Sequence, residues 1–432
     1  MTPILLLLLA LTQGQPQTGT LTPEERALTA FVDADNPRAL ALLERVVNIN
    51  SGTMNVAGVR EVGAVFRAEF AALGFKTEWV DGKPFERAGH LVAEHPGAGP
   101  RLLLIGHLDT VFEPDSSFQK FERLSPTAAK GPGITDMKGG NVVMLQTLRA
   151  LQSVGLLKSM NIVVVMTGDE EAAGRPLSLA RAALVKAAQG ADVAIGFEDG
   201  ASNPKTAVIG RRGTTNWELR VKGKPAHSSQ IFNAENGYGA VFETARILNG
   251  FREKLAGQPH LTFNPGVIVG GTSVDYDAPA SRGTGFGKSN VIAEHTVVTG
   301  DLRALSPEQF AAAKTAMRAI AAASLPQTSA TLTFDDGYPP LAPTPGNERL
   351  LTLYDRASLD VGAGPVGPVD PDKAGAADVS FVAGHARMIL DGVGLMGSGG
   401  HTVDETADLT TLPMMTKRMA VLLARLQRHG VK

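Results

Sequence analysis

The stretch RLLLIGHLD, residues 101–109, joins a run of apolar residues to a histidine and an aspartate. Apolar runs of this length are typical of strands that are buried on both faces of a sheet. Similar runs occur at residues 91–94, 161–166 and 192–195, and helical spacing of apolar residues occurs at 37–47, 56–73, 141–151 and 177–188. This alternation predicts an α/β fold with a mixed, mostly parallel sheet flanked by helices.

The pattern changes after Arg211, where strands and helices follow in a different order. The sequence predicts strand 214–221, helix 235–254, strands 261–269 and 290–303, helix 307–323 and strand 330–334. The order βαββαβ is that of a ferredoxin-like α+β unit. We therefore expect an insert, residues 211–338, that interrupts an α/β domain formed by residues 22–210 and 339–432 and ending in a helix over 412–426.

Net charge and the distribution of apolar residues indicate which partners and which cellular location to expect. The 432 residues carry a formal net charge of -2, which offers no general attraction to nucleic acid. The apolar run Ile4–Leu11 is too short to span a bilayer but suits a signal peptide, although a basic segment before it is missing. We predict a signal peptide in residues 1–20 and a secreted or periplasmic protein, with a cytoplasmic protein as the alternative. No other segment reads as a membrane span.

His107 and Asp109 follow the strand at 101–105 directly. Side chains two residues apart on an extended segment point to the same side. The Asp109 carboxylate is therefore placed to orient the imidazole of His107 while the other ring nitrogen binds a metal. Taken alone, a His-x-Asp pair is more often a simple surface or core hydrogen bond.

Further carboxylates and a second histidine lie at strand ends and in glycine-rich loops. Asp136 opens a helix, where it could equally be an N-cap. Glu170 and Glu171 follow a buried-looking strand, and acids in that position are costly to desolvate without cations nearby. Glu198 follows another strand, and His401 lies in the loop Gly-Ser-Gly-Gly-His. Each could be a solvated loop residue, but with His107 they supply two histidines and several carboxylates from one α/β domain.

At this point the sequence resembles the M20 metallopeptidase family, which includes glutamate carboxypeptidases, acetylornithine deacetylase, succinyl-diaminopimelate desuccinylase and aminoacylases. The resemblance covers nearly the whole chain after residue 20. Its motifs, in order, are Gly-His-Leu-Asp-Thr-Val, Gly-Ile-Thr-Asp-Met-Lys-Gly-Gly, Thr-Gly-Asp-Glu-Glu, Gly-Phe-Glu198, Gly210-Arg-Arg-Gly with Ala226-His-Ser, Asn290-Val-Ile with Asp301-Leu-Arg, and Gly-Gly-His401. The resemblance implies a zinc-peptidase-like catalytic domain and an insert that serves as lid and dimerisation domain.

The resemblance also implies a pair of metal ions. Asp136 would bridge two zinc ions, with His107 and Glu198 completing one site and Glu171 and His401 completing the other. Histidine nitrogens and carboxylate oxygens, with no cysteine thiolate among them, suit zinc, and cobalt or manganese could substitute. A water between the metals would lose a proton near neutral pH and attack an amide carbonyl.

The remaining roles come from the same resemblance. Glu170 would be the general base that accepts the proton of the water and returns it to the leaving amine. His227, on the insert, would reach the active site of the partner subunit in a homodimer and steady the oxyanion. Asn290 and Arg303 match positions that hold a substrate carboxylate, and an Arg fork suits that group.

Two stretches depart from the family pattern, and both concern specificity. The segment 273–289 is longer than in many members and is expected to form a loop beside Asn290 that reshapes the binding site. Near the end of the insert, glutamate-selective relatives carry an Arg where this chain reads Gly-Tyr338-Pro. These departures put glutamate specificity in doubt and leave hydrolysis untouched.

The sequence therefore favours a metal-dependent hydrolase of small N-acyl amino acids or short peptides with a free carboxylate. It leaves open an exopeptidase of the carboxypeptidase type and a deacylase. Two rivals are weaker. A binuclear phosphoesterase also uses paired metals, but nothing else indicates a phosphate site. An inactive binding homologue is disfavoured because all five ligands and Glu170 are present.

Overall fold

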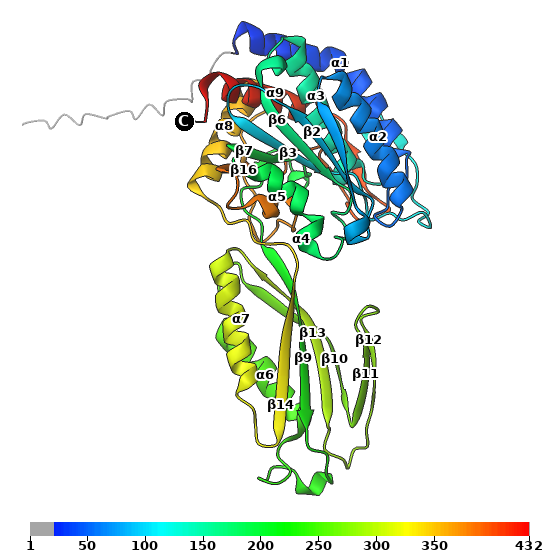
Figure 1. Ribbon diagram of the computed structural model, residues 1–432, viewed down its shortest axis with the longest axis vertical. Coiled ribbons are helices and arrows are strands. Elements are labelled where there is room, and N and C mark those ends of the chain that lie inside the picture. Colours follow the sequence, from blue (N-terminus) through cyan, green and yellow to red (C-terminus); the bar gives the residue numbers. More distant parts are fainter. Residues whose placement is uncertain (1–20, 432) are drawn as a thin grey trace, which may run out of the picture.

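The computed structural model describes residues 21–431 and has an α/β domain joined to an elongated α+β insert (Figure 1). The predicted signal peptide lies outside the described residues. The α/β domain and the insert have separate apolar cores, one centred on residues such as Leu104 and the other on residues such as Trp217. In the described part of the chain, no helix is both long and apolar enough to cross a membrane.

The sheet of the α/β domain confirms the predicted fold class. Its strand order is β1-β2-β6-β3-β7-β16, with β6, β3, β7 and β16 parallel and with β1 and β2 antiparallel at one edge. Its strands are β1 Lys76–Asp81, β2 Gly89–His95, β3 Arg101–His107, β6 Asn161–Thr167, β7 Val193–Gly196 and β16 Met388–Leu390.

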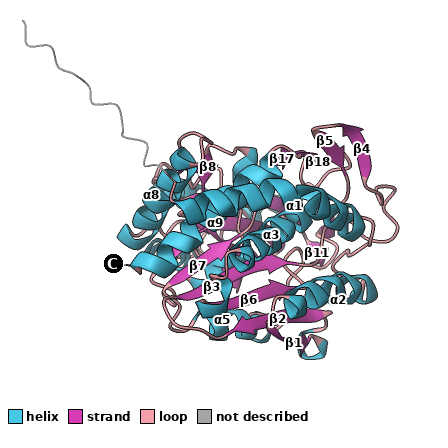
Figure 2. Ribbon diagram, turned by 90° about the horizontal axis from the view of Figure 1, so that it is seen from above, coloured by secondary structure: helices cyan, strands magenta, loops and turns pink. Residues whose placement is uncertain are grey.

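Helices cover both faces of this sheet, as Figure 2 shows. Alternate residues of β3 enter different cores: Leu102 and Leu104 pack under the helices of one face, while Leu103 and Ile105 pack under those of the other. Burial on both faces explains why these strands read as unbroken apolar runs. On the first face lie α1 Pro23–Val47, α2 Val56–Ala72, α3 Gly139–Ser153, α8 Pro345–Asp360 and α9 Thr411–His429; on the second lies α5 Ala182–Ala188, preceded by α4 Leu177–Ala180.

Two helix predictions need correction. We expected a helix from residue 37, but α1 begins at Pro23 with a capping box between Thr22 and Glu25, and Pro37 lies inside it. The missing backbone donor of Pro37 is tolerated because the fully buried face of α1 continues past it. The helix expected over 177–188 is divided into α4 and α5 at Arg181, whose backbone leaves the helical conformation (φ -106°, ψ 2°).

The insert has the predicted βαββαβ order. Its four strands pair antiparallel in the order β10-β13-β9-β14, and its two helices cover one face. These elements are β9 Gly213–Gly223, α6 Gly239–Leu255, β10 Thr262–Gly271, β13 His295–Ala304, α7 Pro307–Ala322 and β14 Thr328–Asp336. The strand expected from residue 290 begins at His295.

The stretch 273–289 is not the loop that we expected. It forms a hairpin of β11 Ser273–Asp277 and β12 Arg282–Phe286 beside β10 and β13 (Figure 1). The Tyr276 hydroxyl lies 3.1 Å from the Thr299 hydroxyl, which fastens the hairpin to the insert sheet. The remaining short strands are β4 Glu122–Ser125, β5 Ala128–Lys130, β8 Thr206–Ala207, β15 Gly367–Pro368, β17 Gly397–Ser398 and β18 Thr406–Asp408.

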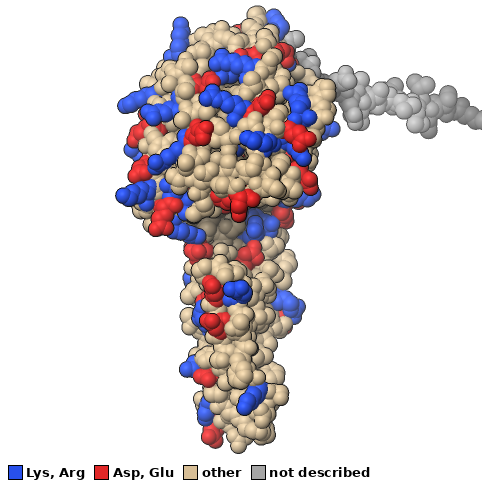
Figure 3. Space-filling view, turned by 90° about the vertical axis from the view of Figure 1, so that its right-hand side faces the viewer, with Lys and Arg blue, Asp and Glu red and all other residues tan. Residues whose placement is uncertain are grey.

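Charges are mixed over the surface that Figure 3 shows. Basic and acidic side chains alternate there over both the α/β domain and the insert, without a continuous patch of one sign. This distribution agrees with the near-neutral net charge of the chain.

Candidate active site

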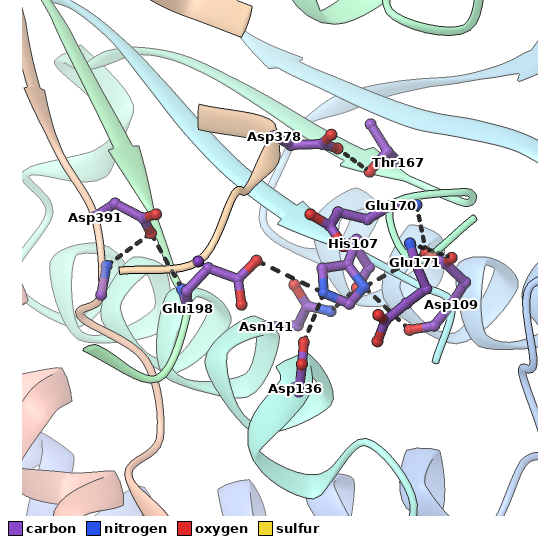
Figure 4. Close-up of polar contacts among 12 residues, drawn as sticks. His107, Asp109, Asp136, Asn141, Thr167, Glu170, Glu171, Glu198, Asp378 and Asp391 are labelled. Atoms are coloured by element: carbon purple, nitrogen blue, oxygen red, sulfur yellow. Dashed lines mark hydrogen bonds and ion pairs between the residues drawn. The ribbon is translucent and has the colours of Figure 1, made fainter. Parts of the chain in front are cut away.

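The site lies at the carboxyl ends of the parallel strands. β3 ends at His107, β6 is followed by Glu170 and Glu171, and β7 is followed by Glu198. Because β6, β3 and β7 are parallel neighbours, their carboxyl ends lie side by side, and the side chains converge there (Figure 4). Asp136, at the turn into α3, and His401, from the loop before β18, complete the cluster.

Asp136 lies between the two histidines. Its Oδ1 atom is 3.0 Å from Nε2 of His107, and its Oδ2 atom is 2.8 Å from Nε2 of His401. Glu198 Oε1 lies 3.6 Å from the same His107 nitrogen, and Glu171 Oε2 lies 3.3 Å from the same His401 nitrogen. The five side chains therefore form two groups of three that share Asp136.

The donor set fits a pair of cations. Ligand atoms that lie about 2.0–2.1 Å from a tetrahedral ion are roughly 3.3 Å apart, and the separations within the two groups range from 2.8 to 3.6 Å. Oε1 of Glu171 is buried without a hydrogen-bond partner among the described residues. A buried carboxylate oxygen without a donor is unfavourable unless a cation lies beside it.

The protonation equilibria show how much negative charge is concentrated here. Burial, together with the neighbouring charge of Asp136, raises the pKa of Glu171 to about 11 in the metal-free protein. Burial and the charges of Asp378 and Asp136 raise the pKa of Glu170 to about 8. Burial also raises the pKa of Glu198 well above its usual value. Without cations, the carboxyl groups of Glu170 and Glu171 hold protons at neutral pH.

The imidazole of His107 is held by a different atom from the one that we expected. His107 is 1% exposed, and its Nδ1 atom lies 3.0 Å from the backbone carbonyl oxygen of Asp109 and 3.4 Å from the carboxylate of that residue. The Asp109 carboxylate accepts from the backbone N–H groups of Glu170 and Glu171, at 3.0 and 3.1 Å, and from the Thr53 hydroxyl at 2.7 Å. Asp109 thus fixes both the histidine and the backbone of the two glutamates.

Two further acids support the cluster and were not predicted from the sequence. Asp391 is fully buried, accepts from the N–H of Glu198 at 3.3 Å and pairs with Arg211 at 2.7 Å. Glu405 accepts from the backbone N–H of Asp136 at 3.1 Å and of two residues just before it. Arg211 belongs to a quoted motif and Glu405 lies four residues after His401, but Asp391 follows a strand of only three residues that leaves no periodic signal.

The site residues predicted on the insert lie apart from this cluster. His227 follows the end of β9 that is farther from the α/β domain, and its neighbour Ser228 donates from its N–H to the carbonyl oxygen of Asn290 at 2.9 Å. Arg303 lies near the other end of β13, opposite Thr214, and pairs with Asp301 at 3.0 Å. The structure therefore places Asn290 beside His227 and separates both from Arg303 by the length of a strand.

Carboxylates and histidines that converge at the open end of a mostly parallel sheet define the class of metal-dependent hydrolases. The chain belongs to peptidase family M20/M25/M40, whose model matches residues 103–425. It is therefore an enzyme of a family that acts on amide bonds, as the sequence motifs predicted.

Among curated relatives, carboxypeptidase G2 of a Pseudomonas species is 26% identical over 404 residues, which is 91% of both chains. Succinyl-diaminopimelate desuccinylase of Gluconacetobacter diazotrophicus is 26% identical over 419 residues, 95% of this chain and 99% of the relative. The solved structure of aminopeptidase PepT from Bacillus cereus shares the fold with a TM-score of 0.71 at 19% identity, over 90% of this chain and 97% of that one. YXEP of Bacillus subtilis, a dinuclear metal-binding peptidase of the M20 family, has a TM-score of 0.64 at 16% identity, over 91% of this chain and 99% of that one.

Proposed function

We propose that the protein is a binuclear zinc hydrolase that cleaves the amide bond of a small N-acyl amino acid or short peptide with a free carboxylate. The observation that carries this proposal is the position of Asp136 between two histidine-carboxylate groups, with Glu170 beside them. The family supplies the reaction class, and the geometry supports the roles that we assign to these side chains.

The ligand set follows from the two groups of side chains. Asp136 would be shared by both ions, His107 and Glu198 would hold one, and Glu171 and His401 would hold the other. Nitrogen and oxygen donors suit zinc, with cobalt or manganese as substitutes. When bound, the ions would act as Lewis acids and lower the pKa of water in the site.

Glu170 is the candidate general base. Its carboxylate would take the proton from the water that adds to the carbonyl carbon, and would then give this proton to the leaving nitrogen as the C–N bond breaks. Burial raises its pKa to about 8 without metal, and bound cations would lower this value, which leaves Glu170 able to accept and return a proton near neutral pH. Asp109 holds the backbone of Glu170 and the ring of His107 in place.

The insert would supply substrate recognition and the dimer contact. We assign residues 22–210 and 339–432 to the catalytic domain and residues 211–338 to a lid and dimerisation domain. His227 and Asn290 lie together at the end of the insert that is remote from their own metal cluster. In a homodimer they would reach the active site of the partner subunit, while Arg303, near the α/β domain, would bind the substrate carboxylate within its own subunit.

The relatives named above favour two substrate classes, carboxypeptidase substrates and N-succinyl amino acids. Both relatives are 26% identical to this chain and match over most of it. We keep the carboxypeptidase-like exopeptidase as the first candidate and the deacylase as the second. We also propose export to the periplasm or medium through residues 1–20, which N-terminal sequencing of the native protein would test.

The function is tested by incubating the zinc-loaded full chain with N-acyl amino acids, dipeptides and folate-type glutamates while free amine is measured. We expect hydrolysis in at least one class and close to two zinc ions per chain. Glu170→Gln should keep both ions and lose turnover by about 100-fold or more, whereas Glu61→Gln, an exposed change on α2, should leave turnover unchanged. Near-normal turnover in Glu170→Gln, or a single ion at saturating zinc, would refute the proposed mechanism.

A further inference from the structure

Tyr338 lies where the chain returns from the insert to the α/β domain. The two chain segments that connect the α/β domain to the insert pair with each other. The N–H of Thr214 donates to the carbonyl oxygen of Tyr338 at 2.8 Å, and the N–H of Gly337 donates to the carbonyl oxygen of Thr214 at 3.0 Å. A further bridge joins Arg211 to Leu341. The backbone of Tyr338 therefore belongs to the two-stranded connection that carries the insert.

The side chain of Tyr338 reaches into the α/β domain. Its hydroxyl donates to the backbone carbonyl oxygen of Glu170 at 2.6 Å and accepts from Nη2 of Arg181 at 3.1 Å. The ring packs against Phe381 with a centroid separation of 5.0 Å. Burial raises the pKa of Tyr338 well above its usual value, so the hydroxyl keeps its proton and remains a donor.

The backbone around Glu170 is held at several points. The N–H groups of Glu170 and Glu171 both donate to the Asp109 carboxylate. Arg181, which is 1% exposed, donates to the carbonyl oxygen of the residue before Glu170 at 3.1 Å. The carbonyl oxygen of Glu170 accepts from Tyr338. Of Asp109, Arg181 and Tyr338, which hold this backbone, only Tyr338 belongs to the segments that connect the insert to the α/β domain.

Among the described residues, Arg175 also links the same loop to the insert, and it donates to the backbone carbonyl oxygen of Asp336 at 3.3 Å. Arg175 pairs with Asp335 at the end of β14, at 3.2 Å, but both side chains are more than half exposed. Exposed ion pairs contribute little. The half-buried hydrogen bond of Tyr338 is therefore the stronger connection between the insert and the loop that carries Glu170.

We propose that Tyr338 is a positioning residue that fixes the orientation of Glu170 through its carbonyl oxygen and ties that orientation to the insert. The inference rests on the proposed function, in which Glu170 is the general base. A catalytic group that is displaced by about 1 Å can cost about 100-fold in rate. The position of the insert on the α/β domain thereby affects the chemical step as well as substrate binding.

The test compares Tyr338→Phe with Tyr354→Phe. The first variant removes the hydroxyl and keeps the ring on Phe381. The second removes a fully buried tyrosine hydroxyl, on α8, that lies 3.9 Å from Sδ of Met415 and interacts with Arg418. For Tyr338→Phe we expect kcat to fall by about 10- to 100-fold while KM and zinc content stay as in the wild type. Tyr354→Phe should leave kcat unchanged.

Hydrogen exchange gives a readout that does not depend on activity. In Tyr338→Phe, with or without zinc, amides in the peptide 168–172 should exchange about tenfold faster, because one hydrogen bond that closes this segment is lost. Wild-type kcat or unchanged exchange in this peptide would overturn the positioning role. If the wild type hydrolyses no amide substrate, the proposed function fails instead, and hydrogen exchange still reports whether Tyr338 holds the segment.

Discussion

Removing the metal ions should make the stability of the protein fall steeply with pH. In the metal-free protein Glu170 keeps its proton up to about pH 8, and Glu171 keeps its proton to a higher pH. In the unfolded chain both groups ionise near pH 4.5. The folded state therefore binds more protons, and its stability, fully present below pH 4.5, is lost as the pH rises toward the folded-state values.

The size of this effect follows from the two groups. Each group that holds a proton only in the folded state contributes about 1.4 kcal/mol per pH unit, so Glu170 and Glu171 together amount to roughly 5 kcal/mol from pH 5.5 to pH 7.5. Burial lowers the pKa of His107, but its hydrogen bonds to carboxylates outweigh burial and raise the pKa well above 6.5. Above pH 6.5 this histidine therefore also reduces the free energy of unfolding as the pH rises. A loss of this size approaches the total stability of many domains.

The assay is thermal unfolding from pH 5.5 to pH 8, followed by circular dichroism in zinc-saturated and chelator-treated protein. We expect the metal-free Tm to fall by roughly 10 °C over this range and the zinc-loaded Tm to stay nearly constant. Zinc binding at pH 7 should release protons, measurable by calorimetry in buffers of different ionisation enthalpy. In the metal-free state, the Tm of Glu171→Gln should fall less with rising pH than the Tm of Glu61→Gln. Parallel Tm curves without proton release would refute the reasoning.

Two further predictions concern stability and assembly. Arg181→Met should destabilise the protein by about 3–5 kcal/mol in urea unfolding, because Asp169 and Asp378, which Arg181 contacts at 2.6 and 2.7 Å, would be left buried without a cation; an unchanged midpoint would contradict this role of Arg181. Light scattering at working concentration should give a dimer, and a monomer would contradict the role proposed for His227.

The strand ends were predictable because burial on both faces leaves an unbroken apolar run, and polar residues that follow such runs meet at one edge of a parallel sheet. For this reason the sequence placed His107, Glu171 and Glu198 correctly at the carboxyl ends of β3, β6 and β7. It could not show that the backbone carbonyl oxygen of Asp109 lies closer to Nδ1 of His107 than the Asp109 carboxylate does, since a pattern of side chains carries no information about the direction of backbone carbonyl groups.

Other features depend on tertiary contacts that no local pattern records. The hairpin over 273–286 was missed because β12 contains Gly283 and Gly285, which weaken its strand pattern, although β11 alternates regularly. Asn290 and Arg303 were expected to hold one carboxylate, yet β13 lies between them and keeps them apart in a single chain. Tyr338 was considered only for specificity, because its hydrogen bond to Glu170 joins residues 168 positions apart.

The paired crossing at Thr214 and Tyr338 has an evolutionary consequence. The insert enters and leaves the α/β domain at a single point and has its own core around Trp217 and Phe251. Because the two ends of the insert are paired, the α/β domain meets it as a closed loop. A longer or shorter insert therefore changes the loop-closure entropy of the α/β domain only slightly. The five side chains of the metal cluster all come from the α/β domain. Recombination could therefore exchange the part of the insert between the paired segments at Thr214 and Tyr338, and substrate choice could diverge while these five side chains and Tyr338 are inherited unchanged.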